Sequence, residues 1–324
     1  MAASSDTERV LRHVAATAAM APSIFNTQPW RWQVSRGMLR LWADHGRRLV
    51  VADPEGRMLT ISCGVGLHHA RVAIAAAGHE AAVSRLPDPM DPDLLAEIAL
   101  GGAHEVQPEE LKLYEAIPRR RTDRRGFGPE PVPEVVAAQL VAAAEAQRAR
   151  LHLVNRGQIA QLALAAAQAA ATQLADPEYR RELISWTHRP SWSGDGVPTN
   201  TAVAQSPRQV PVRQYAPFDG AQVMDPGSNT DLRALYAIIF TEEDHPIDWL
   251  RAGEALSAVL LTATAEGLGT APISDVTELS ITRDKLRDLL PQFGVPQLAA
   301  RIGQAPKTPP PSAPRRSTDE VIYP

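Results

Sequence analysis

The chain has 324 residues, of which 44% are hydrophobic and 22% are charged, and its formal net charge at pH 7 is −4. This composition is ordinary for a soluble globular protein with one large domain or two smaller ones, and the slight acidity argues against a general nucleic-acid-binding role. The single cysteine, Cys63, excludes an internal disulfide and a cysteine-based zinc site, while the polar start and the lack of an apolar run of ~18 residues favour a cytoplasmic protein without a membrane span.

The first third of the chain predicts a helix, a hairpin and a second, buried helix. Val10, Leu11, Val14 and Ala18 recur at the spacing of one helix face. The expected elements are a helix over residues 6–20, an irregular loop over 22–30, strands over 32–34 and 39–42 joined by a turn at Arg36-Gly37, a helix over 59–78, a strand over 83–86 and a helix that begins at residue 91 or 92.

The rest of the chain alternates further helices and strands around one irregular segment. Residues 176–231 are rich in Trp, Pro and Gly and show little periodicity, which is typical of a lid or binding loop, here over about 175–230. The other expected elements are a helix ending at Pro118, helices over 133–148 and 157–174, strands over 151–154 and 235–240, a helix over 249–266 closed by Gly267, strands over 271–274 and 298–302, and a proline-rich surface tail over 306–316.

Two of the predicted helices resemble each other. Leu67 and Gly78 of the earlier helix match Leu256 and Gly267 of the later one, and each helix leads into a strand. The similarity indicates an internal duplication, although two alanine-rich helices could also converge on the same pattern.

The loop that follows the first helix combines two prolines with amide and hydroxyl side chains. Pro22 and Pro29 exclude regular structure, and Ser23, Asn26 and Gln28 supply hydrogen-bonding groups between them. The loop therefore suits a polar, planar ligand. The alternative is a plain connection whose Ser and Asn cap helices.

Five arginines fall within the seven residues 119–125, and they predict a phosphate site. Arg120, Thr122 and Arg124 alternate, so in extended geometry they point to one side. Two guanidinium groups and a hydroxyl match the needs of a terminal phosphate. The alternatives are a solvated basic loop or a nucleic-acid contact, and the overall acidity argues against the latter.

Other catalytic and cofactor motifs are missing. The chain has no GxSxG, no P-loop and no GxGxxG after a strand, and His68-His69 are not expected to chelate a metal together. The motif search therefore names no catalytic side chain and no metal ligand.

These motifs resemble those of one family. Pro22-Ser23-Ile24-Phe25-Asn26-Thr27-Gln28-Pro29-Trp30 resembles the Pro-Ser-x-x-Asn-x-Gln-Pro-Trp motif of FMN-dependent nitroreductases. Arg120-Arg121-Thr122-Asp123-Arg124 looks like their Arg-Arg-Ser-x-Arg phosphate motif, and Gly267-Leu268-Gly269-Thr270-Ala271-Pro272 like the segment that passes the flavin edge. Arg315-Arg316 resembles a late basic pair that also reaches the phosphate.

The order of these motifs differs from the ordinary family pattern, in which the arginine motif comes first. Ordinary homodimers build each FMN site from both subunits, so the reversed order implies a fused pseudo-dimer with one composite site. This arrangement is similar to the actinobacterial Acg-type branch, which is associated with dormancy and stress. The implied halves are residues 1–112 and 113–324, and a monomer is favoured over a homodimer because the fusion already joins both halves.

The resemblance implies an α+β fold with antiparallel sheets flanked by helices, and NAD(P)H-dependent reduction of a nitroaromatic, quinone or related small aromatic acceptor through FMN, with NADPH or NADH as reductant. The alternative is a protein that stores FMN under its lid. Ser274-Asp275 replaces the Glu-Gly pair found beside the flavin in many relatives, and Asp275 would disfavour an anionic reduced flavin. The implied cofactor contacts are Pro22, Ser23, Asn26, Gln28, Arg120, Arg121, Thr122, Arg124, Pro272, Ile273, Ser274, Arg315 and Arg316.

Overall fold

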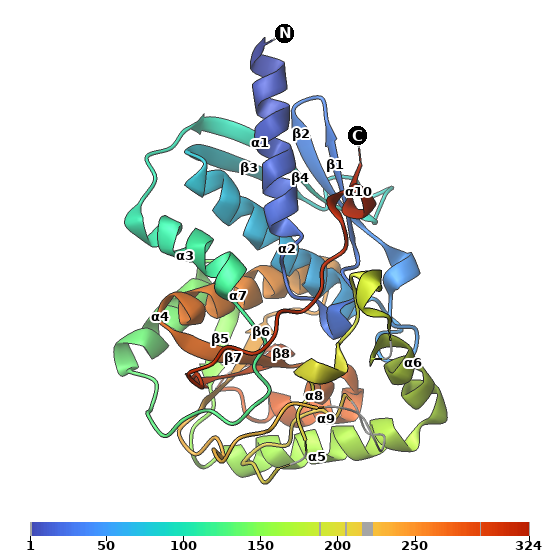
Figure 1. The fold of residues 1–324 in the computed structure, drawn as a ribbon, viewed down its shortest axis with the longest axis vertical. Coiled ribbons are helices and arrows are strands. Elements are labelled where there is room, and N and C mark those ends of the chain that lie inside the picture. The colour runs from blue at the N-terminus through green and yellow to red at the C-terminus, as the bar shows by residue number, and fades with distance from the viewer. Residues whose placement is uncertain (1, 188, 205, 216–222, 292, 324) are drawn as a thin grey trace.

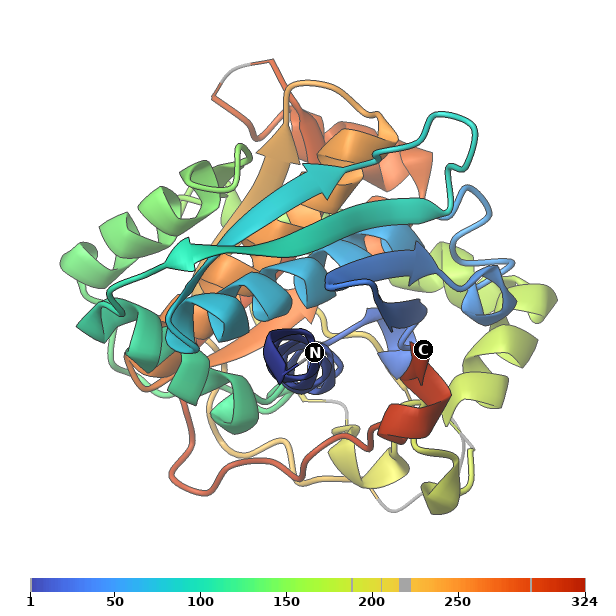
Figure 2. The same ribbon diagram turned by 90° about the horizontal axis from the view of Figure 1, so that it is seen from above.

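The protein is described by a computed structural model that covers residues 2–187, 189–204, 206–215, 223–291 and 293–323, without the side chains of residues 2–5 and 191. Two sheets lie on either side of a central pair of long helices, α2 (Arg57–Ala76) and α7 (Pro246–Ala265) (Figures 1 and 2). Further helices cover the outer faces. The predicted α+β class, with antiparallel sheets flanked by helices, is confirmed.

The first sheet follows helix α1 (Ala2–Ala18) and has the order β3-β4-β2-β1-β9. The turn between β1 and β2 is formed by Arg36 and Gly37, with φ angles of 52° and 72°, as a two-residue hairpin of right-handed twist requires. Its strands are β1 (Trp30–Ser35), β2 (Met38–Ala43), β3 (His79–Arg85), β4 (Leu94–Ala103) and the parallel β9 (Ile322–Tyr323).

The second sheet has the order β5-β6-β8-β7 and is antiparallel throughout. Helices α5 (Ile159–Ala175), α8 (Asp275–Glu278) and α9 (Ser280–Arg287) lie below it in Figure 1. Its strands are β5 (Arg150–Leu153), β6 (Leu235–Thr241), β7 (Leu268–Ile273) and β8 (Val295–Gln304). The remaining helices are α3 (Pro108–Arg119), α4 (Glu134–Glu145), α6 (Pro177–Thr187) and α10 (Thr318–Val321).

The two sheets share one connectivity. In each, a hydrogen-bonded strand pair (β1 and β2, or β5 and β6) precedes the long helix, and a second pair (β3 and β4, or β7 and β8) follows it. The strand orders β3-β4-β2-β1 and β7-β8-β6-β5 are therefore the same order in two successive parts of the chain.

The central helices approach each other at two glycines. A Cβ atom on Gly64 would collide with the carbonyl oxygen of Leu250, and a Cβ atom on Gly253 with that of Ile61. Gly64 and Gly253 are 189 residues apart in sequence, and so are Ile61 and Leu250, whose carbonyl oxygens they approach. His68 and its hydrogen-bond partner Ser257 are separated by the same 189 residues. The contact is thus the same patch facing itself, as at a two-fold interface.

Helix α2 is long and apolar enough by composition to cross a bilayer, but it is a core helix of this fold. In its most apolar window, 89% of the residues are buried inside the protein. Its neighbours are α7 on one side and the first sheet on the other (Figure 2). Its hydropathy therefore reflects burial between these layers.

Three predictions about individual elements were wrong. The helix expected from residue 91 or 92 is strand β4. This strand pairs with β2 on one edge and with β3 on the other, and its Leu95 and Ile98 are buried. This pairing overrides the helix propensity of its Leu, Ala and Glu residues. The segment 176–231, expected to be irregular, opens with helix α6, and α3 continues through Pro118 to Arg119.

Candidate functional site

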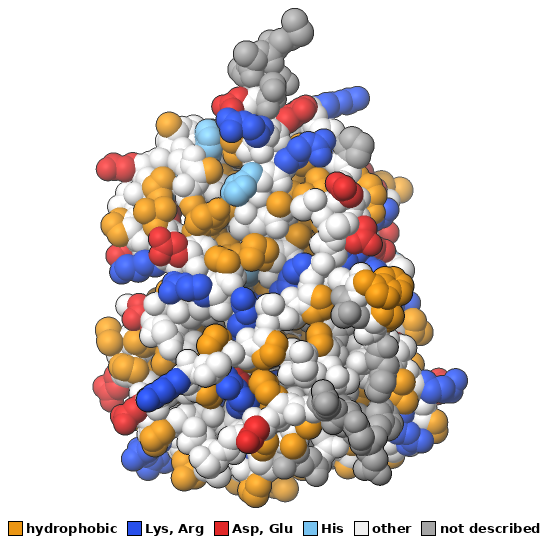
Figure 3. Space-filling model, in the orientation of Figure 1, with side chains coloured by type: hydrophobic (Ala, Val, Ile, Leu, Met, Phe, Trp, Pro, Cys, Tyr) orange, Lys and Arg blue, Asp and Glu red, His pale blue; other side chains and the backbone are white. Residues whose placement is uncertain are grey.

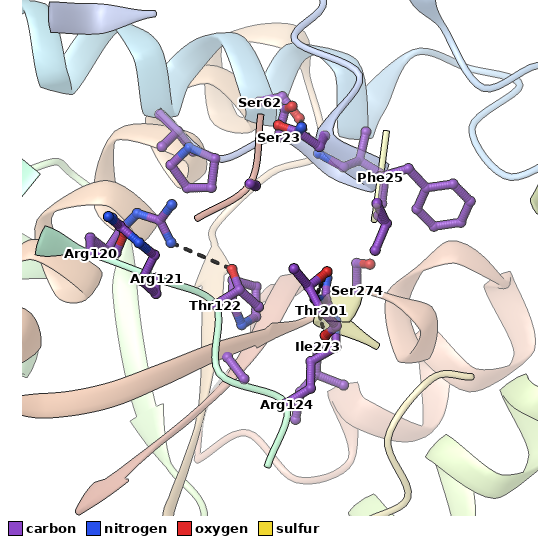
Figure 4. Close-up of a pocket in the computed structure, with 18 of the residues that line it drawn as sticks. Ser23, Phe25, Ser62, Arg120, Arg121, Thr122, Arg124, Thr201, Ile273 and Ser274 are labelled. Carbon is purple, nitrogen blue, oxygen red and sulfur yellow. Dashed lines mark hydrogen bonds between the residues drawn. The ribbon is translucent and has the colours of Figure 1, made fainter. Parts of the chain in front are cut away.

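A cavity of about 320 Å³ lies between the two sheet-bearing halves. Segments that are distant in sequence line it, among them the loop at residues 20–26, α2, the arginine segment, residues 196–215, the β7–α8 junction and the C-terminal tail. Figure 4 shows Arg120 and Arg121 at one end, and Phe25, Ile273 and Ser274 at the other. On the molecular surface, basic side chains lie along the boundary between the halves (Figure 3). This size and mixture of linings is typical of a small-molecule site.

Three residues of the loop at residues 22–28 are held in the left-handed region of φ. Phe25, Asn26 and Gln28 have φ angles of 46°, 54° and 51°, which side-chain-bearing residues rarely adopt. The Ser23 hydroxyl accepts a hydrogen bond from the Gln28 amide at 2.8 Å, and Ser62 of α2 accepts one from the Ile24 amide at 3.1 Å. Strain of this kind persists where the surroundings enforce it and is frequent at ligand sites.

Asn26 and Gln28 join this loop to the lid and the tail. Asn26 Nδ2 donates to the carbonyl oxygens of Gly196 and Pro314 at 3.0 and 3.1 Å. Gln28 Nε2 donates to Gly194 O at 2.9 Å, and its Oε1 accepts from the Arg316 amide at 3.0 Å. Asn26 lines the cavity, whereas Gln28 and Arg316 do not, so the structure does not bring these two predicted ligand contacts to it.

The arginines at one end of the cavity lack anionic partners. Arg120 is 5% exposed; its Nε atom has no partner among the described residues, and its side chain makes only a 3.5 Å contact with Thr122 Oγ1. Arg121 and Arg315 donate only to carbonyl and amide oxygens, such as Pro118 O and Asn26 Oδ1. In the described part of the chain, no carboxylate forms an ion pair with these three arginines.

The pKa values of two of these arginines are lowered. Burial, together with the charges of Arg315 and Arg121, lowers the pKa of Arg120 to about 9. Burial and Arg121 lower the pKa of Arg315 to about 10. A buried cation without a counterion is costly, and an anion among the three would remove that cost. The cluster therefore fits a phosphate, which accepts charge-assisted hydrogen bonds from several guanidinium groups.

Arg124, although it lines the cavity, is turned toward the lid. Its Nη1 donates to Thr201 O at 3.1 Å, and its guanidinium stacks on the Tyr215 ring at 4.3 Å. Arg120 and Thr122 come together as the alternation predicted, but Arg124 already has these lid contacts. The arginine segment thus combines an anion-facing part with a lid-facing part.

The other end of the cavity contains the β7–α8 junction. Pro272, Ile273 and Ser274 line it, as does Asp275, which is 3% exposed. Burial raises the pKa of Asp275 to about 6, against the opposing effect of Arg213. The Asp275 carboxylate therefore sits in the cavity wall at the position that the sequence marked as unusual.

Sequence reasoning missed several lining residues in the lid and in α2. Arg213 stacks on Phe25 at 4.9 Å and forms a 2.6 Å ion pair with Glu278, while Tyr215 meets Phe25 edge-on at 5.7 Å. Ser62 lines the cavity from α2. The clustering of aromatic and proline residues was the only signal for the lid contacts, and it does not single out a residue.

The segment at residues 194–198 is anchored to the segment between β2 and α2 by a buried carboxylate. Asp195, 5% exposed, forms ion pairs with Arg47 and with Arg189, the latter at 3.0 Å. Arg189 in turn stacks on Trp186 of α6 at 3.8 Å. These contacts hold residues 194–198 over the cavity beside Asn26.

Comparison with known proteins identifies the family of the chain. A model of the nitroreductase family matches residues 117–303. The chain belongs to the nitroreductase family. Among its relatives, “Putative NAD(P)H nitroreductase Rv3131” of Mycobacterium tuberculosis is 41% identical, covering 98% of this chain and 92% of its own. “Putative NAD(P)H nitroreductase acg” of the same species is 36% identical, covering 98% and 96%. The resemblance to the Acg-type branch is confirmed.

The solved structures that resemble this chain are more distant in sequence. One is a nitroreductase with bound FMN from Bacteroides fragilis, at 13% identity and a TM-score of 0.39, covering 63% of this chain and 94% of that one. Another is iodotyrosine deiodinase bound to FMN and 3-iodo-L-tyrosine, at 16% identity and a TM-score of 0.40, covering 63% and 95%.

The matched range contains only part of the residues that line the cavity. Residues 117–303 include the arginine segment and the β7–α8 junction. The strained loop at Ser23–Gln28 and the tail arginine Arg315 lie outside that range, on opposite sides of it. The cavity thus combines the family-matched core with both ends of the chain.

Proposed function

We propose that the cavity binds FMN and that the protein is an NAD(P)H-dependent reductase of nitroaromatic, quinone or related small acceptors in the cytoplasm. The main support is the guanidinium of Arg120, which is buried without a counterion among the described residues and lies at one end of a cavity of ligand size. A bound anion would remove the cost of this buried charge. The FMN-bound structure from Bacteroides fragilis and the NAD(P)H nitroreductase names of the relatives support the choice of flavin and reductant.

The lining residues divide between two tasks. Arg120, Arg121, Thr122 and Arg315 would hold the phosphate, and the backbone of Pro272–Ser274 would face the ring edge across from the Ser23–Asn26 loop. Arg124 would close the lid over the site. When bound, FMN would supply the redox chemistry between NAD(P)H and the acceptor, while these residues supply position and electrostatics.

We also propose that residues 1–112 and 113–324 are two fused half-units, so that the protein works as a monomeric pseudo-dimer. The repeated strand order and the self-facing contact at Gly64 and Gly253 support this. The phosphate-facing Arg120 comes from the second half and the Ser23 loop from the first. The tail crosses from β8 to pair β9 with β1 of the first sheet, which adds a further link between the halves (Figure 1).

A storage function is the second candidate, and the lid favours it. Asp195 anchors the lid through two arginines, and Asn26 bonds Gly196 directly over the cavity. A lid held this firmly would exclude nicotinamide. The Asp275 carboxylate in the cavity wall would also disfavour negative charge on a reduced flavin.

Anaerobic mixing of the purified protein with NADPH and with NADH separates the two candidates. A reductase loses its flavin absorbance rapidly with at least one of them, whereas a store keeps it. A purified protein without flavin absorbance, even after incubation with FMN, would contradict both.

A further inference from the structure

Asp275 belongs to the wall that separates two spaces inside the protein. One is the cavity proposed for FMN, and the other (the α5–α6 space), of about 440 Å³, lies between α5, α6, residues 203–214 and the start of α8. Asp275 lines both of them and is 3% exposed. A titratable group at this position responds to what the cavity binds and exchanges protons with the other space.

The Asp275 carboxylate has few partners within the protein. Its Oδ1 accepts a hydrogen bond from the Val276 amide at 3.0 Å, and no side chain among the described residues donates to either of its oxygens. In the same part of the chain, no arginine, lysine or histidine forms an ion pair with it. A buried carboxylate without such partners is costly, and it loses this cost when it binds a proton.

The ionisable neighbours of Asp275 differ from it in their proton affinity. Burial is the largest influence and raises the pKa of Asp275 to about 6, while Arg213 opposes this shift and Glu278 adds to it. Arg213 is itself paired with Glu278 at 2.6 Å. On α6, burial raises the pKa of Tyr179, so this hydroxyl stays neutral at pH 7. Of these four groups, Asp275 is the one that the structure moves toward neutral pH.

The other elements around α8 leave Asp275 without a further counter-charge among the described residues. Helix α5 contains no charged residue, and the charged side chains of α9 are exposed except for Arg283. The nearby arginines have partners of their own: Arg57 of α2 donates to Thr277 O, Arg283 pairs with Asp244, and Arg301 of β8 pairs with Asp231. Only Arg213 offsets the charge of Asp275.

The α5–α6 space connects Asp275 with solvent. Gln173, Ser206 and Gln214 line this space with polar side chains, and its volume is large enough for several water molecules. Ala171 and Pro207 line it as well and are exposed at the protein surface. Water that enters from the surface therefore brings protons to Asp275 from the side that faces away from the flavin cavity.

We propose that Asp275 is the proton carrier of the flavin cavity, a role that rests on the proposed FMN binding. The reductant delivers two electrons and one proton to the bound flavin, and the Asp275 carboxylate takes a second proton from water in the α5–α6 space. On reoxidation the acceptor receives two electrons and both protons, and Asp275 becomes a carboxylate again. This balance converts a quinone to a hydroquinone, or a nitro group to a nitroso group and water.

The direction of the proton transfer follows from the charges. At pH 7 the Asp275 side chain is mostly ionised before reduction, because its pKa is about 6. The ring end of the cavity is the end opposite Arg120 and Arg121, where Ile273 and Ser274 lie (Figure 4). Negative charge that reduction brings to this end raises the pKa of a neighbouring carboxyl, and burial strengthens the effect. Asp275 then binds a proton at neutral pH.

The first test counts protons in the FMN-loaded protein. The midpoint potential is measured anaerobically at a series of pH values around neutrality, and its slope gives the number of protons taken up with two electrons. We expect about two protons for the wild type and about one for Asp275→Asn, which keeps the shape of the side chain but cannot bind the proton. Asp288→Asn, which changes an exposed carboxylate after α9, is the matched control and should behave like the wild type.

Infrared difference spectroscopy of electrochemically reduced and oxidised protein then shows where the second proton resides. Reduction should produce the carbonyl band of a protonated carboxylic acid in the wild type and in Asp288→Asn, and this band should be missing in Asp275→Asn. One proton in the wild type, two in Asp275→Asn, or a wild-type spectrum without the acid band would overturn the proposal. The wild-type spectrum decides the question even where Asp275→Asn does not fold.

Flavin binding and proton uptake are measured separately in this design. A protein without flavin absorbance after incubation with FMN contradicts the FMN site itself. A protein that binds FMN and is reduced without protonation of Asp275 contradicts only the role of Asp275. Because electrochemical reduction needs no nicotinamide, both outcomes are equally clear for a reductase and for a store.

Discussion

Replacing Arg120 with methionine should raise the free energy of unfolding of the apoprotein and, at the same time, greatly weaken FMN binding. Arg120 is buried without a counterion, and its pKa falls from 12.5 to about 9 through burial and the charges of Arg315 and Arg121. At 1.36 kcal/mol per pKa unit, the charged side chain costs the folded apoprotein up to about 5 kcal/mol. Because partial water access and relaxation reduce this cost, we expect Arg120→Met to recover about 2 kcal/mol, or roughly 4 °C in Tm.

The same substitution would remove the charge-assisted hydrogen bonds that we propose Arg120 donates to the phosphate. Each contributes about 1.5–3 kcal/mol, so FMN affinity should fall by roughly 100-fold or more. The assay pairs thermal unfolding of the apoprotein with FMN titration followed by flavin fluorescence. Arg119→Met is the matched control, because Arg119 is exposed at the end of α3 and donates only to Glu115 O.

The pH dependence of the Arg120 effect has a definite sign. The folded-state pKa lies below the unfolded one, so the cost is fully present below pH 9 and disappears as pH rises toward 12.5. The stabilisation by Arg120→Met should therefore be constant around neutral pH. A less stable apoprotein, together with FMN affinity within threefold of wild type, would show that Arg120 is an ordinary structural arginine.

Three further substitutions test other parts of the argument. Gly253→Ala should destabilise the fold by about 3 kcal/mol, because its Cβ meets a carbonyl of α2, whereas Gly102→Ala, with open space around it, should not; equal unfolding midpoints would contradict the tight helix contact. Asp195→Asn removes the ionic anchor of the lid and should speed FMN release roughly tenfold in stopped-flow fluorescence, and an unchanged rate would mean that the lid is held elsewhere. Asp275→Asn should raise the midpoint potential of bound FMN at pH 7. Burial raises the Asp275 pKa to about 6. At pH 7 this variant should therefore also unfold at a higher denaturant concentration than wild type, and this difference should disappear as pH falls from about 6 to 4. The reverse trend in chemical unfolding would refute the buried-carboxylate argument.

Local sequence patterns correctly predicted the elements whose secondary structure is set by residues close to them in sequence. The hairpin at Arg36-Gly37 and the helix closed by Gly267 depend on turn chemistry within a few residues, and both are present. Strand β4 could not be found this way, because Leu94–Ala103 becomes a strand only by pairing with β2 and β3. Its Ala, Leu and Glu residues favour a helix on their own.

In the candidate site, too, local motifs predicted some features and tertiary contacts determined the others. Ser23, Asn26, Arg120 and Ser274 were predicted, and they meet at one cavity. Gln28 belongs to the same motif, but its amide bonds the lid and the tail, a role that depends on Gly194 and Arg316 far away in sequence. Motif matching identifies which residues are near a site, and only the fold decides which of their atoms face the ligand.

The arginines would also link the proposed FMN binding to the association of the two proposed half-units. Arg120 and Arg121 follow helix α3, whereas Arg315 arrives on the C-terminal tail and bonds Asn26 and Met20 of the first half. Docking the tail therefore places a third cation beside two others, and the lowered pKa values of Arg120 and Arg315 reflect burial first and this repulsion second. An FMN phosphate placed among them, as we propose, would convert repulsion into shared attraction. By linkage, tail docking and FMN binding must then strengthen each other by the same factor, so the flavin would hold the halves together as well as occupy the space between them.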